Sequence, residues 1–169
     1  MHDRQPIKGP NMNAYRMKPL KYPWPPLLYV GACVLAFFLN AYIAPVSPFE
    51  EQEPVMWMTG AMIATGAIAI DFWAIKTLMS NYTPLSQHQR ARRLVTEGPY
   101  RYSRNPIYLG YTLLMIAAGM ILGNVWLILA APLTAMLTTM VAIRCEEMHL
   151  LVRFGVDFER YCQHTRRWL

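Results

Sequence analysis

Apolar residues fill four long stretches of the chain, and shorter polar or charged segments separate them. The stretches cover about residues 27–44, 55–79, 107–123 and 125–143. Each is close to the roughly 17–25 residues with which a helix crosses the hydrocarbon core of a bilayer. The pattern therefore predicts an all-α, polytopic membrane protein with four transmembrane helices, followed by a helical tail over residues 144–169.

Only a very short segment joins the third and fourth apolar stretches. Gly123 and Asn124 lie between them and have the composition of a tight turn. Two helices joined by so short a turn form an antiparallel hairpin, in which Gly119 and Gly123 supply a G-x-x-x-G packing motif. The hairpin is expected to bring the start of the third helix and the end of the fourth to the same side of the membrane.

The charged residues predict how these helices are oriented. The segments 1–26, 80–105 and 144–169 are rich in Lys and Arg, whereas residues 45–54 carry three acids and no base. Because cytoplasmic segments carry an excess of positive residues, both termini are expected in the cytoplasm. We interpret residues 1–169 as a single membrane-embedded domain of the bacterial inner membrane, with a cytoplasmic N-terminal arm and a cytoplasmic C-terminal tail.

Composition narrows the possible chemistry. The chain is 54% hydrophobic and only 15% charged, which favours a membrane protein over a soluble one. Membrane orientation accounts for the net charge of +6, so no nucleic-acid partner is expected. Cys33, Cys145 and Cys162 lack metal or redox spacing and are expected to be free thiols, and the histidines are too scattered to predict a metal site. Nucleotide-binding, zinc-protease and serine-hydrolase motifs are absent from the sequence.

A polar cluster is predicted where the second basic segment enters the third helix. Tyr100, Arg104 and Asn105 precede Pro106, which suits the first turn of a helix. They bring an aromatic ring, a guanidinium and an amide to the positive end of that helix, a combination suited to an anionic or zwitterionic ligand. A girdle of Tyr and Arg anchors at the membrane interface would have the same composition, so both interpretations stay open here.

A pair of glutamates, Glu146 and Glu147, follows the fourth stretch directly. At the C-terminal end of that helix they would be unfavourable to its macrodipole. A positive group is therefore expected beside them: Arg144, an arginine of the segment 101–104, or a cationic group of a ligand. Neighbouring residues of a helix point about 100° apart, so only one of the two is expected to point fully into a shared site.

One carboxylate, Asp71, falls about two thirds of the way along the second stretch. A carboxylate is costly in hydrocarbon and is a candidate for function. The simpler interpretation places Asp71 near the cytoplasmic interface, paired with Lys76 or with an arginine of the following loop.

Taken together, these segments resemble a known superfamily. The run L-V-T-E-G-P-Y-R-Y-S-R-N-P-I-Y-L-G, the hairpin, then E-E-M-H-L, F-G-V-D-F-E-R-Y and a closing R-R-W are similar to the isoprenylcysteine carboxyl methyltransferase and phospholipid methyltransferase superfamily of integral membrane enzymes. The resemblance covers about residues 81–169. It implies an enzyme that transfers a methyl group from S-adenosylmethionine to a lipophilic or membrane-associated acceptor among the membrane lipids: an isoprenylcysteine-type carboxylate, a phospholipid amine or a small thiol.

The resemblance also implies a set of site residues. The cofactor would be held by Leu94, Val95, Tyr100, Asn105, Tyr108, Glu146 and Glu147, and the catalytic residues would be Arg104, Asn105, Arg144 and Glu147. Asn105 replaces the histidine that is common in the superfamily's R-H-P-x-Y segment. The substitution keeps a hydrogen-bonding group but removes a titratable one.

Two other classes of protein share parts of this pattern. Membrane sterol and enone reductases, which use NADPH, resemble the superfamily in their C-terminal helices, but they usually have more than four spans. A four-helix transporter of the small multidrug type would carry a carboxylate in its first span, and residues 27–44 contain none.

Overall fold

The structure, a computed structural model, describes residues 24–43, 54–81 and 94–169. It contains the helices α1 (Trp24–Tyr42), α2 (Pro54–Ser80), α3 (Pro106–Leu122), α4 (Val125–Thr138), α5 (Arg144–Phe154) and α6 (Val156–His164), with a short 3-10 helix η2 (Gly98–Arg101) and a π-helical segment η3 (Thr139–Ile143). Most of the predicted N-terminal arm, most of the acidic connection, and Arg90, Arg92 and Arg93 of the loop after α2 lie outside the described residues.

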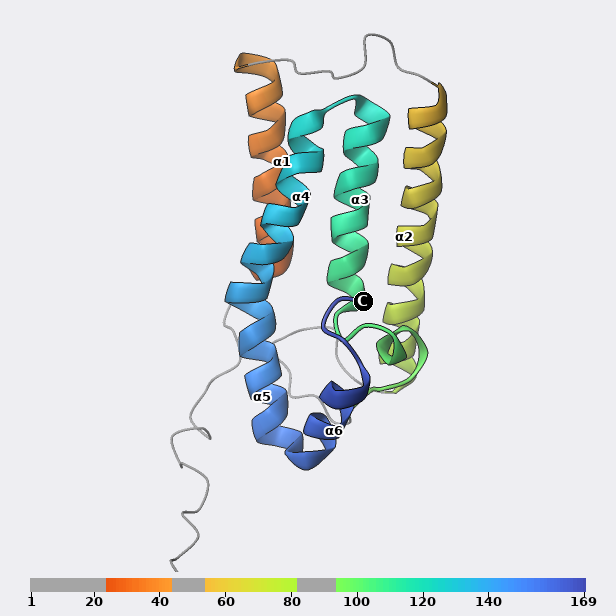
Figure 1. Cartoon of the computed structure of the whole chain (residues 1–169), viewed down its shortest axis with the longest axis vertical. Helices are drawn as coiled ribbons and strands as arrows, with labels where there is room; N and C mark the ends of the chain where they lie inside the picture. Colours follow the sequence, from red (N-terminus) through yellow and green to blue (C-terminus); the bar gives the residue numbers. More distant parts are fainter. Residues whose placement is uncertain (1–23, 44–53, 82–93) are drawn as a thin grey trace, which may run out of the picture.

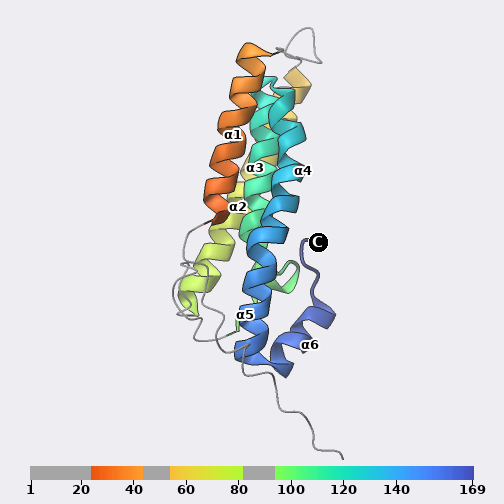
Figure 2. The same cartoon turned by 90° about the vertical axis from the view of Figure 1, so that its left-hand side faces the viewer.

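The long helices form a bundle around the α3–α4 hairpin (Figure 1). α2 packs along α3, α3 packs along α4, and α1 packs against α4. α5 prolongs α4 beyond the bundle, and α6 turns back beside α5 (Figure 2). The C-terminus thereby returns to the start of α3.

The outward faces of the bundle are apolar. On α1 and α2, large side chains such as Val34 and Met62 are 64% and 71% exposed. Contiguous exposed apolar surface of this extent indicates contact with lipid. α1, α2 and the continuous helix from Val125 to Phe154 are long and apolar enough to cross a membrane, and α3 is a shorter apolar helix of 17 residues. The chain is therefore an all-α polytopic membrane protein, as the sequence predicts.

The boundaries of α1 and α3 follow from proline chemistry. α1 begins at Trp24, earlier than the predicted start at residue 27, and places Pro25 in its first turn, where a missing N–H costs no hydrogen bond. Pro106 opens α3 in the same way, as predicted.

The predicted hairpin is confirmed. Gly123 ends α3 in the left-handed region with φ of 64°, and the side chain of Asn124 accepts a hydrogen bond from the backbone N–H of Leu127 at 3.4 Å. A side chain at Gly119 would come within 2.6 Å of Ile128 Cγ1, so this glycine lets α3 and α4 approach closely. Gly119 thus serves packing, while Gly123 serves the turn.

The fourth helix differs from the prediction in one important respect. The chain stays helical through η3 into α5, with Ile143 and Arg144 both in right-handed helical geometry, and the helix ends only at Gly155, whose φ is 53°. Glu146 and Glu147 therefore lie within a continuous helix and not at its C-terminal end. The expectation of an unfavourable macrodipole at these residues was wrong, because the unpaired carbonyls lie more than one turn further on.

Candidate functional site

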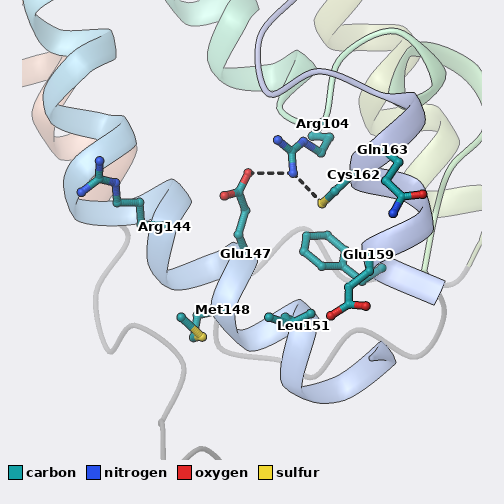
Figure 3. Close-up of a pocket in the computed structure, with 9 residues that line it drawn as sticks. Arg104, Arg144, Glu147, Met148, Leu151, Glu159, Cys162 and Gln163 are labelled. Carbon is teal, nitrogen blue, oxygen red and sulfur yellow. Dashed lines mark hydrogen bonds and ion pairs between the residues drawn. The ribbon is translucent and has the colours of Figure 1, made fainter. Parts of the chain in front are cut away.

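A pocket of about 510 Å³ lies between α5 and α6, at the end of the bundle where α3 begins (Figure 3). Such a volume is within the range of about 300–1,000 Å³ that small-molecule sites occupy. α6 contributes the buried ring of Phe158. Polar side chains come from α5, from α6 and from the segment before α3. The lining residues are Arg104, Arg144, Glu147, Met148, Leu151, Phe158, Glu159, Cys162 and Gln163.

Glu147 forms the charged centre of this pocket wall. Its carboxylate lies 3.3 Å from Arg104 Nη1. Arg167, from the C-terminal tail, contacts both oxygens, with Nε donating to Oε1 at 3.0 Å and Nη2 donating to Oε2 at 2.6 Å. This two-point geometry is the strong form of a carboxylate–guanidinium contact, and the hydrogen bond to Glu147 raises the pKa of Arg167.

Arg104 has donor capacity to spare. Its Nη1 contacts both Glu147 and the Cys162 sulfur, which Figure 3 shows on opposite sides of the guanidinium. Its Nε is buried and has no hydrogen-bond partner in the described part of the chain. A buried donor without a partner is costly, so the contacts among the described residues do not fully satisfy the Arg104 guanidinium.

Glu146 points to a different neighbour from Glu147. Tyr108, on the first turns of α3, donates its hydroxyl hydrogen to Glu146 Oε1 at 2.7 Å. The roughly 100° between adjacent helical positions thus directs one carboxylate toward α3 and the other toward the C-terminal tail. As expected, only Glu147 of the two lines the pocket, while Glu146 lies behind it on the α3 side.

The C-terminal tail is bound along the segment before α3. Ser103 and Arg166 form an isolated parallel bridge, in which the Arg104 N–H donates to the Arg166 carbonyl at 3.0 Å. Asn105 Nδ2 donates to the Arg167 carbonyl at 3.0 Å, and the Trp168 indole donates to Thr139 Oγ1 at 3.3 Å. The chain's last residues therefore form part of the site.

Two tyrosines connect α6 to η2 beside this tail. The Tyr161 hydroxyl donates to the carbonyl of Tyr100 at 2.6 Å. Burial raises the pKa of both phenols, and the nearby Glu146 carboxylate adds to the effect on Tyr100. Both side chains therefore stay neutral hydrogen-bonding groups at physiological pH.

The structure brings some predicted site residues together and leaves others apart. Arg104, Arg144 and Glu147 line the pocket. Asn105, Tyr108 and Glu146 contact neighbours of the pocket through the hydrogen bonds described above, and the Tyr100 carbonyl accepts a hydrogen bond from Tyr161 on α6. Leu94 and Val95 are not among the lining residues, although Val95 is buried.

The positive partners of the glutamate pair are only partly those expected. Arg104 was foreseen as a partner and pairs with Glu147. Arg144 is exposed and, as Figure 3 shows, its guanidinium points away from the Glu147–Arg104 contact. Arg167 fills the remaining position. It was missed because the only signal in the sequence was the closing R-R-W, which carries no indication that the chain folds back over the pocket.

Asp71 does not pair with Lys76. Its Oδ1 is buried and has no hydrogen-bond partner among the described residues, and its carboxylate lies directly against the Cα of Gly110 on α3. Neither ion pair found among the described residues involves Asp71, and Arg90, Arg92 and Arg93 of the following loop lie outside them. The simpler interpretation of Asp71 is therefore wrong as regards Lys76.

The three cysteines are free, and in the described residues no group of His, Cys, Asp and Glu has the arrangement of a metal site. Cys162 nevertheless belongs to the pocket wall, a role that its spacing in the sequence does not reveal.

Comparison with known proteins identifies the family of this chain. No curated protein matches the chain significantly. The family model for phospholipid methyltransferases matches residues 55–157, which is more than half of the chain and includes α2, η2, the hairpin and the glutamate pair. The chain belongs to the phospholipid methyltransferase family of membrane methyltransferases.

Proposed function

We propose that this protein is an S-adenosylmethionine-dependent methyltransferase that methylates a lipophilic acceptor at the membrane surface. The observation that carries the proposal is the pocket between α5 and α6, whose wall combines the side chains of Glu147 and Arg104 with apolar ones. Family membership supports the methyl transfer.

The residues of the pocket fit the proposed cofactor. The methionine part of S-adenosylmethionine carries an ammonium and a carboxylate, and its sulfonium adds a second positive charge. Glu147 offers a carboxylate to the cationic groups, while the guanidinium of Arg104 offers donors to the anionic one. Met148, Leu151 and Phe158 supply the apolar surface that a nucleoside requires.

When bound, the cofactor supplies an activated methyl group. The protein's contribution is then placement, because aligning an acceptor with that methyl and excluding water supplies a large part of the rate acceleration. Glu147 is held from two sides by Arg104 and Arg167, and Glu146 is held by Tyr108. Both carboxylates are therefore fixed before a ligand arrives.

The acceptor is proposed to reach the site from the bilayer. The pocket adjoins the start of α3, one of the apolar helices, so a lipid could approach sideways while the polar cofactor enters from the aqueous side. We place that aqueous side in the cytoplasm of a bacterial cell, because the basic segments of the chain lie there under the positive-inside rule.

Isotope transfer tests this function directly. Purified protein is incubated with S-adenosylmethionine carrying a labelled methyl group and with a membrane lipid extract, and the lipids are analysed by mass spectrometry. We expect a labelled lipid product that is lost in Glu147→Ala and retained in Asp157→Asn, an exposed acid outside the pocket. Equal labelling by wild type and Glu147→Ala would contradict the assignment.

A further inference from the structure

We infer that the C-terminal tail, Thr165–Leu169, completes the cofactor site, with Arg167 as a positioning residue for Glu147 and Asn105 as the residue that holds Arg167. The inference rests on the proposed function. It adds residues that the family match does not cover, since that match ends at residue 157.

The first step is the burial and charge of Glu147. Its side chain is 17% exposed and that of Arg104 is 15% exposed, whereas Arg167 is 36% exposed. Arg104 alone reaches one carboxylate oxygen, at 3.3 Å. Arg167 contacts both oxygens and thereby fixes the plane of the carboxylate, which a single contact leaves free to rotate.

The second step is the attachment of Arg167 itself. Its backbone carbonyl accepts hydrogen bonds from Asn105 Nδ2 at 3.0 Å and from Ser103 Oγ at 3.4 Å. The neighbouring Arg166 carbonyl accepts from the Arg104 N–H at 3.0 Å. Arg104, which contacts Glu147 from one side, is thus attached through its own backbone to the tail that contacts Glu147 from the other.

The third step concerns the residue type at position 105. The superfamily resemblance places a histidine at this position, where this chain has Asn105. An amide NH₂ is a donor at every pH, whereas a neutral imidazole donates from only one nitrogen. Asn105 is therefore a permanent donor to the tail carbonyl, and its role in this chain is to position the tail and not to accept a proton.

A ligand-independent measurement tests the attachment. Hydrogen exchange by mass spectrometry on the full-length protein in detergent follows the amides of residues 100–105, among which the Arg104 N–H is bonded to the tail. We expect faster exchange in this segment in Asn105→Ala and in Arg167→Ala, and unchanged exchange in Arg160→Ala, an exposed arginine of α6. Unchanged exchange in both Asn105→Ala and Arg167→Ala would overturn the inference.

Affinity measurements then test the coupling. Calorimetry is expected to show that Asn105→Ala and Arg167→Ala each lower the affinity for S-adenosylhomocysteine by roughly tenfold. Arg167→Lys keeps the charge and is expected to lower the affinity less. If Asn105 acts through Arg167, the double variant loses no more affinity than Arg167→Ala alone. Losses that multiply in the double variant would show that the two residues act independently and would overturn the coupling.

The two failures are distinguishable. If the wild type bound no S-adenosylhomocysteine, the proposed function would fail, while the exchange experiment would still decide whether Asn105 and Arg167 hold the tail. If the wild type, Asn105→Ala and Arg167→Ala all bound the ligand with equal affinity, the proposed function would stand and the role of the tail would be overturned.

Discussion

At the scale of single residues, Gly110 shows how little space separates α2 from α3. A methyl group there would overlap the Asp71 carboxylate, so glycine is required for this approach. We predict that Gly110→Ala lowers the free energy of unfolding by about 1–3 kcal/mol, the usual cost of overpacking. Thermal unfolding in detergent measures the change.

Two further variants make this prediction specific. Gly66→Ala is the matched control, because no atom lies within 4 Å of the added methyl, and the higher helix propensity of Ala is expected to raise stability by at most about 1 kcal/mol. Adding Asp71→Ala to Gly110→Ala is expected to restore part of the lost stability, since it removes the overlapping carboxylate. A Gly110→Ala protein as stable as Gly66→Ala would show that α2 and α3 do not meet in this way.

The Tyr108 hydroxyl gives a second prediction at this scale. It donates to Glu146 Oε1 at 2.7 Å, and leaving a buried hydrogen-bonding group without its partner costs about 1–3 kcal/mol. We expect Tyr108→Phe to weaken S-adenosylhomocysteine binding by roughly tenfold or more. Tyr111→Phe, on the same helix, is the control and is expected to bind normally in the same titration. Equal affinities for the two variants would contradict a role for Glu146 in the site.

At the scale of elements, the π-helical segment η3 sets the direction of the glutamate pair. Such segments insert an extra residue into a helix, and η3 lies directly before α5. Deleting Val141 from it is predicted to rotate Glu146 and Glu147 by about 100° and to separate them from Tyr108 and Arg167. We expect this deletion to abolish S-adenosylhomocysteine binding while far-UV circular dichroism still shows the helical content of the wild type.

The substitution Val141→Ala is the control for the deletion, because it keeps the register and Val141 is partly exposed. It is expected to bind like the wild type. Retained binding in the deletion variant would show that the register of the fourth helix does not position the pair.

The elements differ in how far the sequence predicts them. The four apolar helices and the Gly123–Asn124 turn follow from hydrophobic length and turn chemistry. The continuation of the fourth helix was not foreseen, because polarity rises at Arg144 while the backbone stays helical. A rise in polarity therefore does not mark the end of this helix.

The residues of the site also differ in how far the sequence predicts them. Arg104, Tyr108 and the glutamate pair could be found from their spacing, because the hairpin brings the start of α3 near the end of the fourth helix. Arg167 and Cys162 could not, because their contacts depend on how α6 and the tail turn back after Gly155. A single positive-φ glycine determines that direction, and local patterns do not specify its outcome.

At the scale of the whole molecule, the native cysteines offer a test of orientation. Cys145 is exposed on α5, beyond the apolar part of the fourth helix. We predict that a membrane-impermeant maleimide labels Cys145 in inside-out vesicles and not in right-side-out ones, using protein with Cys33→Ser and Cys162→Ser. Labelling only from the outer side would place the pocket in the wrong compartment for a cytoplasmic cofactor.

The most direct test of the central claim is calorimetric titration of the purified protein with S-adenosylhomocysteine. The wild type and Asp157→Asn are predicted to bind it with the same affinity. Glu147→Gln is predicted to bind at least about tenfold more weakly, because one charged partner of the pocket is lost. Absence of binding to the wild type, or binding of NADPH in its place, would contradict the assignment of this pocket to S-adenosylmethionine.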